Sequence, residues 1–305
     1  MKAILQDILI PIDLSDTSFN ALNTAINMAR RHQARLHLLY VSDIMFYYPK
    51  VGDLTAVQLM AAEVMEKDAY LLEKLTASIK AAHRVDCRLY TVTGNRNLMI
   101  KEWVQQNPVD LTILGLSPSA TDASYLFDSL PYQLLQATNS HVLTVPADKS
   151  VDRFQHIIYP VQSTGTPMSK FPLTRQIAEK NNADVSVISL IERADADISS
   201  SLNRFSARVK FRLDGMARSV TTGQHYTHDR AASLASICRT EVADLVVIEA
   251  DTQRNIKEYF FGNFTQKMLR NPDAAVLCIN PSQRAGNTTS LLTDRVGKRR
   301  LQVAY

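Results

Sequence analysis

The sequence has few of the residues that mark several special classes of protein. Its 305 residues include three cysteines, nine glycines and eleven prolines, which excludes a disulfide scaffold, a collagen-like chain and a low-complexity chain. Long apolar runs are also missing. A membrane-spanning helix needs about 20 consecutive apolar residues, and the apolar run at Leu245–Ile248 is far shorter. Gln6 and Asp7 interrupt the apolar stretch at the N-terminus, so we expect neither a membrane span nor a secretory signal.

Paired cysteines and a basic protein face are equally lacking. Cys87, Cys238 and Cys278 lie far apart without a C-x-x-C spacing, so we expect three buried thiols and a reducing, cytoplasmic location. The net charge is +4, and residues 282–305, with five basic residues and one aspartate, account for all of it. The remaining chain is balanced, which argues against nucleic acid as a partner. The basic tail is expected to be flexible.

An internal repeat dominates what the sequence does contain. Residues 7–13 (DILIPID) align with residues 156–162 (HIIYPVQ), and residues 109–115 (VDLTILG) align with residues 243–249 (ADLVVIE). The number of residues that separates the two copies is smaller in the second match than in the first. The first copy therefore has an insertion between its second and fourth strands, near residues 47–65. A fixed self-similarity of this kind indicates duplication. We expect a first domain at 1–149, a second at 150–281 and a tail at 282–305.

Each copy alternates short apolar runs with helical patterns. In the first copy the apolar runs, which predict strands, are residues 8–12, 36–41, 87–92, 111–114 and 142–145. Their nearly continuous apolar character is typical of a sheet covered on both faces. Between the first two runs, Phe19, Leu22, Ile26 and Ala29 form one apolar helical face. The alternation predicts an α/β fold with a doubly wound, parallel, five-stranded sheet in each copy.

Three residues of the first copy predict a binding crevice. In open parallel sheets ligands bind beyond the carboxyl ends of the strands, where the strand order reverses. Asp13 ends the first strand, Gly115 ends the fourth, and Ser129 begins the last helix, whose free N–H groups favour anions. The combination fits a mononucleotide site. Each residue also has a structural explanation, since Asp13 and Gly115 suit turns and Ser129 suits a helix N-cap.

These motifs resemble the universal stress protein family in its tandem two-domain form. The resemblance rests on the I-P-x-D run at Ile10–Asp13, the V-x-G-N turn at Val92–Asn95 and the V-D-L-x-I-L-G run at Val109–Gly115. It implies two flavodoxin-like (adenine-nucleotide alpha-hydrolase-like) domains that form a pseudo-dimer within the chain, paired along residues 142–145 and 276–279. It leaves a homodimer of the whole chain open. It further implies that Pro11, Asp13, Val41, Gly115 and Ser129 are the candidate residues for ATP or AMP.

The sequence departs from the family's phosphate motif, which is glycine, two residues, glycine, nine residues, glycine and then Ser or Thr. The four slots hold Gly115, Pro118, Asp128 and Ser129. Pro118 has no N–H to offer a phosphate. Asp128 places a carboxylate near the phosphate oxygens, and like charges about 4 Å apart repel by roughly 1 kcal/mol in water. We therefore expect weakened binding of a triphosphate in the first copy.

The second copy departs further. Its four slots hold Glu249, Thr252, Gly262 and Asn263, and Gln162 stands where the first copy has Asp13. We expect no ATP site there.

These features favour a non-enzymatic stress-response protein that acts by binding, as an adaptor for an unidentified protein partner. An ATP or AMP sensor that uses the first domain, and a module that binds a small molecule or lipid, remain the alternatives. An ATP-hydrolysing enzyme is disfavoured because no catalytic base or metal-binding carboxylate pair is evident. No Cys or His cluster at metal-ligand spacing is present in the sequence, so no metal is expected.

Overall fold

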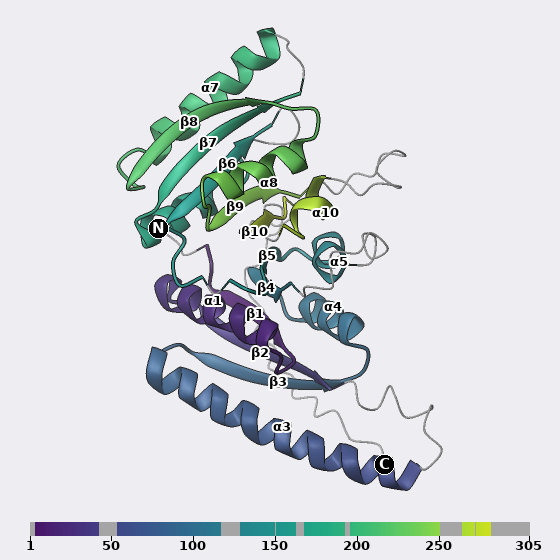
Figure 1. Ribbon diagram of the computed structural model, residues 1–305. Helices are drawn as coiled ribbons and strands as arrows, with labels where there is room; N and C mark the ends of the chain where they lie inside the picture. The colour runs from purple at the N-terminus through teal and green to yellow at the C-terminus, as the bar shows by residue number, and fades with distance from the viewer. Residues whose placement is uncertain are drawn as a thin grey trace.

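One ten-stranded sheet organises the protein. The computed structural model describes residues 4–42, 54–116, 129–149, 151–162, 168–192, 196–250, 264–271 and 273–281. The strand order is β3-β2-β1-β4-β5-β10-β9-β6-β7-β8, with helices on both faces of the sheet (Figure 1). The expected α/β class with two doubly wound halves is confirmed, and the two halves continue one another as a single sheet.

Both halves have the same order of elements. The first contains β1 (Asp7–Ile12), α1 (Asp16–His32), β2 (Arg35–Ser42), α3 (Leu54–His83), β3 (Cys87–Thr93), α4 (Arg96–Gln106), β4 (Leu111–Gly115), α5 (Leu130–Ala137) and β5 (His141–Val145). The second contains β6 (His156–Val161), α6 (Phe171–Asn181), β7 (Asp184–Ile191), α7 (Ala196–Leu213), β8 (Ser219–Tyr226), α8 (Arg230–Thr240), β9 (Leu245–Glu249), α10 (Phe264–Met268) and β10 (Ala275–Ile279).

The two halves join along their last strands. Strands within each half are parallel, whereas β5 and β10 pair in antiparallel fashion, with Leu143 opposite Leu277 and Thr144 opposite Val276. This agrees with the expected pairing of residues 142–145 with residues 276–279. The pairing covers the edge strand of each half, so their unpaired backbone groups are satisfied by the other copy.

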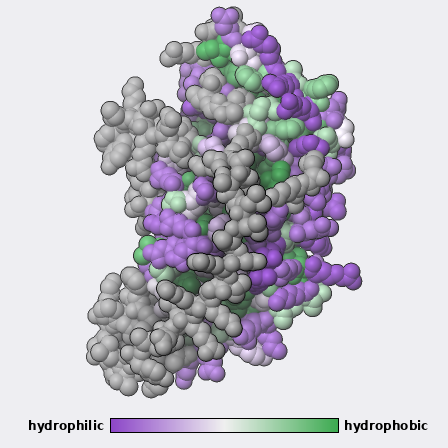
Figure 2. Space-filling model, turned by 180° about the vertical axis from the view of Figure 1, so that it is seen from behind, coloured by the Kyte–Doolittle hydropathy of each residue, from purple (hydrophilic) through white to green (hydrophobic). Residues whose placement is uncertain are grey.

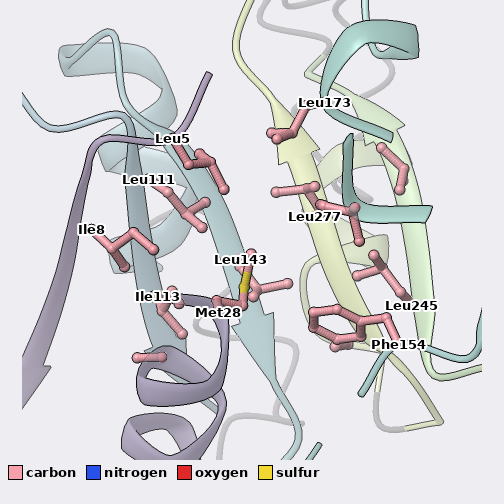
Figure 3. Packing of buried hydrophobic residues seen from close by; sticks show 14 of the residues in the cluster. Leu5, Ile8, Met28, Leu111, Ile113, Leu143, Phe154, Leu173, Leu245 and Leu277 are labelled. Atoms are coloured by element: carbon pink, nitrogen blue, oxygen red, sulfur yellow. The ribbon is translucent and has the colours of Figure 1, made fainter. Parts of the chain in front are cut away.

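The core has two layers, one on each face of the sheet. Successive strand residues point to opposite faces, and Ile8 and Ile10 belong to one apolar cluster while Leu9 belongs to the other. The first cluster packs α1, α3, α6 and α7 against the sheet, and the second packs α4, α5, α8 and α10. The first cluster also runs through the junction between β5 and β10, where Leu143, Leu277, Met28 and Phe154 are drawn in Figure 3.

The insertion of the first copy lengthens a helix. The helix α3 has 30 residues, whereas its counterpart α7 has 18, in agreement with extra sequence between the second and fourth strands. The helix α1 begins one residue after Ser15, whose hydroxyl accepts the Ser18 N–H at 3.2 Å.

The three cysteines are free and buried, as the sequence predicts. Burial raises the pKa of the Cys87 and Cys238 thiols to about 12, and raises that of Cys278 as well. Among the described residues, no helix is long and apolar enough to cross a membrane. The surface seen in Figure 2 is largely hydrophilic where it is described, with apolar residues scattered over it. The tail at 282–305 lies outside the described residues.

Candidate functional site

The sheet opens between β1 and β4 at the carboxyl ends of these strands. The pairing of β1 with β4 covers Ile8–Leu111 and Leu9–Thr112, whereas β1 stays paired with β2 as far as Ile12. The divergence lies where the strand order reverses, which is the usual place for a ligand in this architecture. Beyond it stands the first turn of α1.

Asp13 follows β1 at this opening and is held by its neighbours. Its Oδ1 accepts hydrogen bonds from the Ser15 backbone N–H at 3.1 Å and from the Ser15 hydroxyl at 2.5 Å. Its Oδ2 lies 2.5 Å from Nη2 of Arg96. Partial burial raises the pKa of Asp13, but the Ser15 hydrogen bonds and the Arg96 charge outweigh it and lower the pKa to about 2. The carboxylate is therefore ionised and already paired inside the protein.

Arg96 is a site residue that the sequence analysis missed. It is the first residue of α4 and follows a tight turn in which Gly94 has a φ of +148°, a conformation that favours glycine. The Gly94 N–H donates to the Ser42 carbonyl at 3.0 Å, and the Asn95 side chain caps α4 by accepting the Leu98 N–H at 3.1 Å. This turn places the first residue of α4 in contact with Asp13. The signal in the sequence is an arginine directly after the Gly-Asn turn.

Gly115 is required by packing. A Cβ atom placed on Gly115 would lie 2.6 Å from the Thr17 carbonyl oxygen and 2.8 Å from Thr17 Cγ2. Only glycine lets the first turn of α1 approach the end of β4 so closely. Thr17 thus occupies space beside the glycine that the sequence analysis assigned to a ligand.

Ser129 stands at the N-cap position of α5, but its side chain makes no capping hydrogen bond. The expected N-cap position of Ser129 is confirmed, although its hydroxyl does not cap the helix. Its carbonyl oxygen accepts the N–H groups of Tyr132 and Gln133, both at 3.1 Å, and Pro131 removes a further N–H from the first turn. The start of α5 offers an anion fewer donors than an ordinary helix N-terminus. Pro118 and Asp128 lie outside the described residues.

Pro11 and Val41 lie on the strands that border the opening. Pro11 is buried on β1 opposite Leu39, beyond the last β1 residue paired with β4. Val41 is the penultimate residue of β2 and is 8% exposed. The structure places all five predicted residues at the ends of β1, β2 and β4 and the start of α5. Asp13 and Gly115 both contact residues at the start of α1.

The corresponding opening of the second half is filled by a lysine. The β6–β9 pairing also stops early, at Ile158–Val246. Lys170 precedes α6, and its Nζ donates to the Pro160 carbonyl oxygen and lies 4.5 Å from the centre of the Tyr159 ring. The side chain is buried, and burial lowers the pKa of its amine to about 7, although the charge of Glu249 opposes the shift.

The remaining motif positions of this half, Thr252, Gly262 and Asn263, lie outside the described residues. Beside the opening, the Arg230 guanidinium lies 2.7 Å from Glu192 Oε1 and donates to Gln162 Oε1 at 3.4 Å. The side chain that replaces Asp13 is therefore also bonded within the protein. Among the described residues, no group of three or more His, Cys, Asp or Glu side chains could hold a metal ion.

The strand order and the motif positions agree with a comparison of sequence families. Residues 5–146 match the Universal stress protein family. The first half of the chain belongs to this family. The second half repeats the strand order of this universal stress protein domain, so the chain has the tandem form. The comparison with curated proteins found no match.

Solved structures extend the similarity to the whole chain. A universal stress protein from Archaeoglobus fulgidus DSM 4304 is 16% identical, with a TM-score of 0.67, and the alignment covers 90% of this chain and 96% of that one. A functionally unknown protein from Pseudomonas aeruginosa PAO1 is 15% identical, with a TM-score of 0.60 and coverage of 93% and 97%. A universal stress protein in complex with cAMP is 21% identical and aligns with 46% of this chain and 96% of its own, with a TM-score of 0.32. The first two likenesses establish the fold of the tandem chain.

Proposed function

We propose that this universal stress protein acts by binding, without catalysis, as an adaptor whose nucleotide crevices are closed by its own side chains. The observation that carries the proposal is the ion pair between Asp13 and Arg96. A carboxylate that accepts from Ser15 and pairs with an arginine at 2.5 Å has little capacity left for a base or ribose. A ligand would have to break these contacts before it could use Asp13.

The phosphate side of the crevice supports the same proposal. Polyphosphate binding at a helix N-terminus depends on free N–H groups. In α5, Pro131 lacks one such group, and Tyr132 and Gln133 donate theirs to the Ser129 carbonyl. With Pro118 and Asp128 in the preceding sequence, the phosphates of ATP would find few donors and one repelling charge.

The second half supports an adaptor more strongly. Lys170 fills the opening between β6 and β9 and satisfies the Pro160 carbonyl with its own amine. We infer that this half serves the shape and pairing of the sheet and does not bind ATP.

A second candidate function, an ATP or AMP sensor in the first half, is favoured by the exposure of Arg96. Its side chain is 43% exposed at the mouth of the crevice, and an arginine there suits phosphate recognition. If a nucleotide phosphate drew Arg96 away, Asp13 would become free for the rest of the ligand. Pro11, Val41, Gly115 and Ser129 would then border the nucleotide.

Calorimetric titration with ATP and with AMP distinguishes the two candidates. The adaptor predicts no saturable heat at millimolar nucleotide for the unaltered protein or for Asp13→Asn. Micromolar affinity that is lost in Arg96→Gln and Asp13→Asn, and kept in Arg88→Gln, would establish the sensor. Arg88 is the matched control because it is an exposed arginine on β3, 3.9 Å from Asp86. In Arg96→Gln, the pKa of Asp13 should rise from about 2 toward its ordinary value, as a pH titration by NMR would measure.

A further inference from the structure

A polar groove lies along α1 and uses none of the crevice residues. It has a volume of about 980 Å³ and is bounded by α1, by the segment that links the two halves and by the starts of β6 and β9. The lining residues that matter here are Asn27, Arg30, Arg31, His83, Lys149 and Arg153. The volume is that of an ordinary small-molecule site.

The walls of the groove are fixed by hydrogen bonds between the linking segment and α1. Asn27 Nδ2 donates to Asp152 Oδ1 at 3.1 Å, and Arg31 Nη1 donates to the Asp152 carbonyl oxygen. Arg30 Nη2 donates to Asn27 Oδ1 at 3.2 Å. Further along, the Val151 N–H donates to Thr24 Oγ1 at 3.4 Å. The cationic side chains therefore project from a backbone that is already positioned, which lowers the cost of binding.

Three arginines of the groove have no carboxylate partner in an ion pair. Within the described residues, Arg30, Arg31 and Arg153 take part in no salt bridge. Arg31 is half-buried, and its pKa is lowered by burial and by the charges of Arg153 and Arg30, with only Asp152 opposing. The positive charges here outweigh the negative one.

Three carboxylates line the groove, those of Asp148, Asp152 and Asp244, and two of them accept hydrogen bonds within the protein. Asp244 Oδ2 accepts the backbone N–H groups of Gln155 and His156 at 2.8 and 2.9 Å. Asp152 accepts from Asn27. These hydrogen bonds leave the negative charges in place, so the three carboxylates offset part of the charge of the three arginines and Lys149. The groove keeps one net positive charge.

We propose that this groove is a binding site for a phosphorylated small molecule. The guanidinium groups of Arg30, Arg31 and Arg153 match the oxygens of a phosphate group in geometry and charge. The Asn23 side chain supplies a neutral polar contact for the rest of the ligand. The predominantly polar lining does not suit a lipid chain. The site is independent of the crevice, since Asp13, Gly115 and Ser129 are not part of it.

Calorimetric titration of the full chain with inorganic pyrophosphate tests the proposal. The groove variant is Arg30→Gln with Arg153→Gln, because both side chains are exposed and their loss should leave the fold intact. A thermal melt confirms that the variant folds. Arg88→Gln, on β3 and outside the groove, is the matched control. We expect saturable binding by the unaltered protein, affinity at least about tenfold weaker in the groove variant, and no more than a twofold change in the control.

Three results would overturn the site. The first is no saturable binding of pyrophosphate at millimolar concentration. The second is unchanged affinity in the groove variant, which would place the anion elsewhere. The third is an equal loss in the groove variant and in Arg88→Gln, which would mean nonspecific attraction screened by salt. The variant Asp13→Asn shows whether the crevice contributes to pyrophosphate binding. If the anion binds in the groove, the affinity of this variant should not change.

Discussion

Two ionisable side chains, Asp13 and Lys170, occupy the crevices of the two halves with opposite charge. Asp13 stays ionised because Ser15 and Arg96 stabilise its negative charge. Lys170 has a carbonyl oxygen and an aromatic ring as its neighbours, and its burial disfavours the ammonium form. At this scale the duplicated sites have diverged in charge while the backbone around them has been kept.

Lys170→Met should stabilise the protein at neutral and acidic pH. The pKa of Lys170 is about 7 in the folded state and near 10.5 when unfolded, so the folded state disfavours the proton throughout that interval. Stability of the unaltered protein therefore rises as pH increases from about 7 toward 10.5 through this group. The variant should be more stable by about 1–4 kcal/mol at pH 7 and below, with the gain shrinking as the pH approaches 10.5.

Denaturant unfolding at several pH values measures this difference. Lys67→Met, an exposed position on α3, is the control and should show no pH-dependent gain. A variant that is destabilised equally at every pH would mean that the contacts of the amine with Pro160 and Tyr159 outweigh the cost of its burial.

The hydrogen bonds at the starts of the strands show the repeat more clearly than the crevices do. Asp110 Oδ2 accepts the backbone N–H groups of Gln6 and Asp7, at 2.7 and 2.9 Å, at the start of β1. Asp244 Oδ2 does the same for Gln155 and His156 at the start of β6. These aspartates belong to the aligned V-D-L and A-D-L runs. Each one joins two neighbouring strands, β1 to β4 in the first half and β6 to β9 in the second, and this shared role explains why this part of the pattern appears twice.

Asp244→Ala should lower the free energy of unfolding by about 1–3 kcal/mol, because two backbone N–H groups at the start of β6 lose their acceptor. The same change at Asp110 should have a similar cost. Chemical denaturation of each variant measures it, with Asp214→Ala as the control at an exposed position. Equal stability of the Asp244 and Asp214 variants would contradict this role.

The whole molecule is built around a core that crosses the junction of the two halves. Leu143 on β5 and Leu277 on β10 are opposite one another and fully buried, in the cluster that also contains Met28 and Phe154 (Figure 3). The sheet is continuous through this junction, with β3 and β8 at its two edges. A shared core of this kind predicts that the halves unfold together.

A double-mutant cycle at the junction tests that coupling. Leu143→Ala and Leu277→Ala should each cost about 2–5 kcal/mol, and their combined effect should differ from the sum by more than about 0.5 kcal/mol. Leu72→Ala with Leu277→Ala is the control pair and should be additive, because Leu72 lies on α3 at the far end of the first half. Calorimetry of the unaltered protein should show one transition; two separate transitions would contradict a shared core.

The sequence by itself determined the class of fold, the duplication, the junction strands and the buried cysteines. Apolar periodicity and repeated motifs report which residues must leave water, and this information is local. Apolar runs therefore located β1, β4 and β5, and the resemblance to the universal stress protein family implied the junction along 142–145 and 276–279. The positions of Asp13 and Gly115 at the carboxyl ends of their strands followed from the same local pattern.

Only the tertiary structure decided how the crevices are occupied. The pairing of Asp13 with Arg96, the approach of Thr17 to Gly115 and the burial of Lys170 beneath Tyr159 join residues from different elements. Arg153 likewise joins Arg30 and Arg31 only when the linking segment lies along α1. Charge pairing and close packing depend on distances between elements, and the order of residues along the chain does not contain those distances.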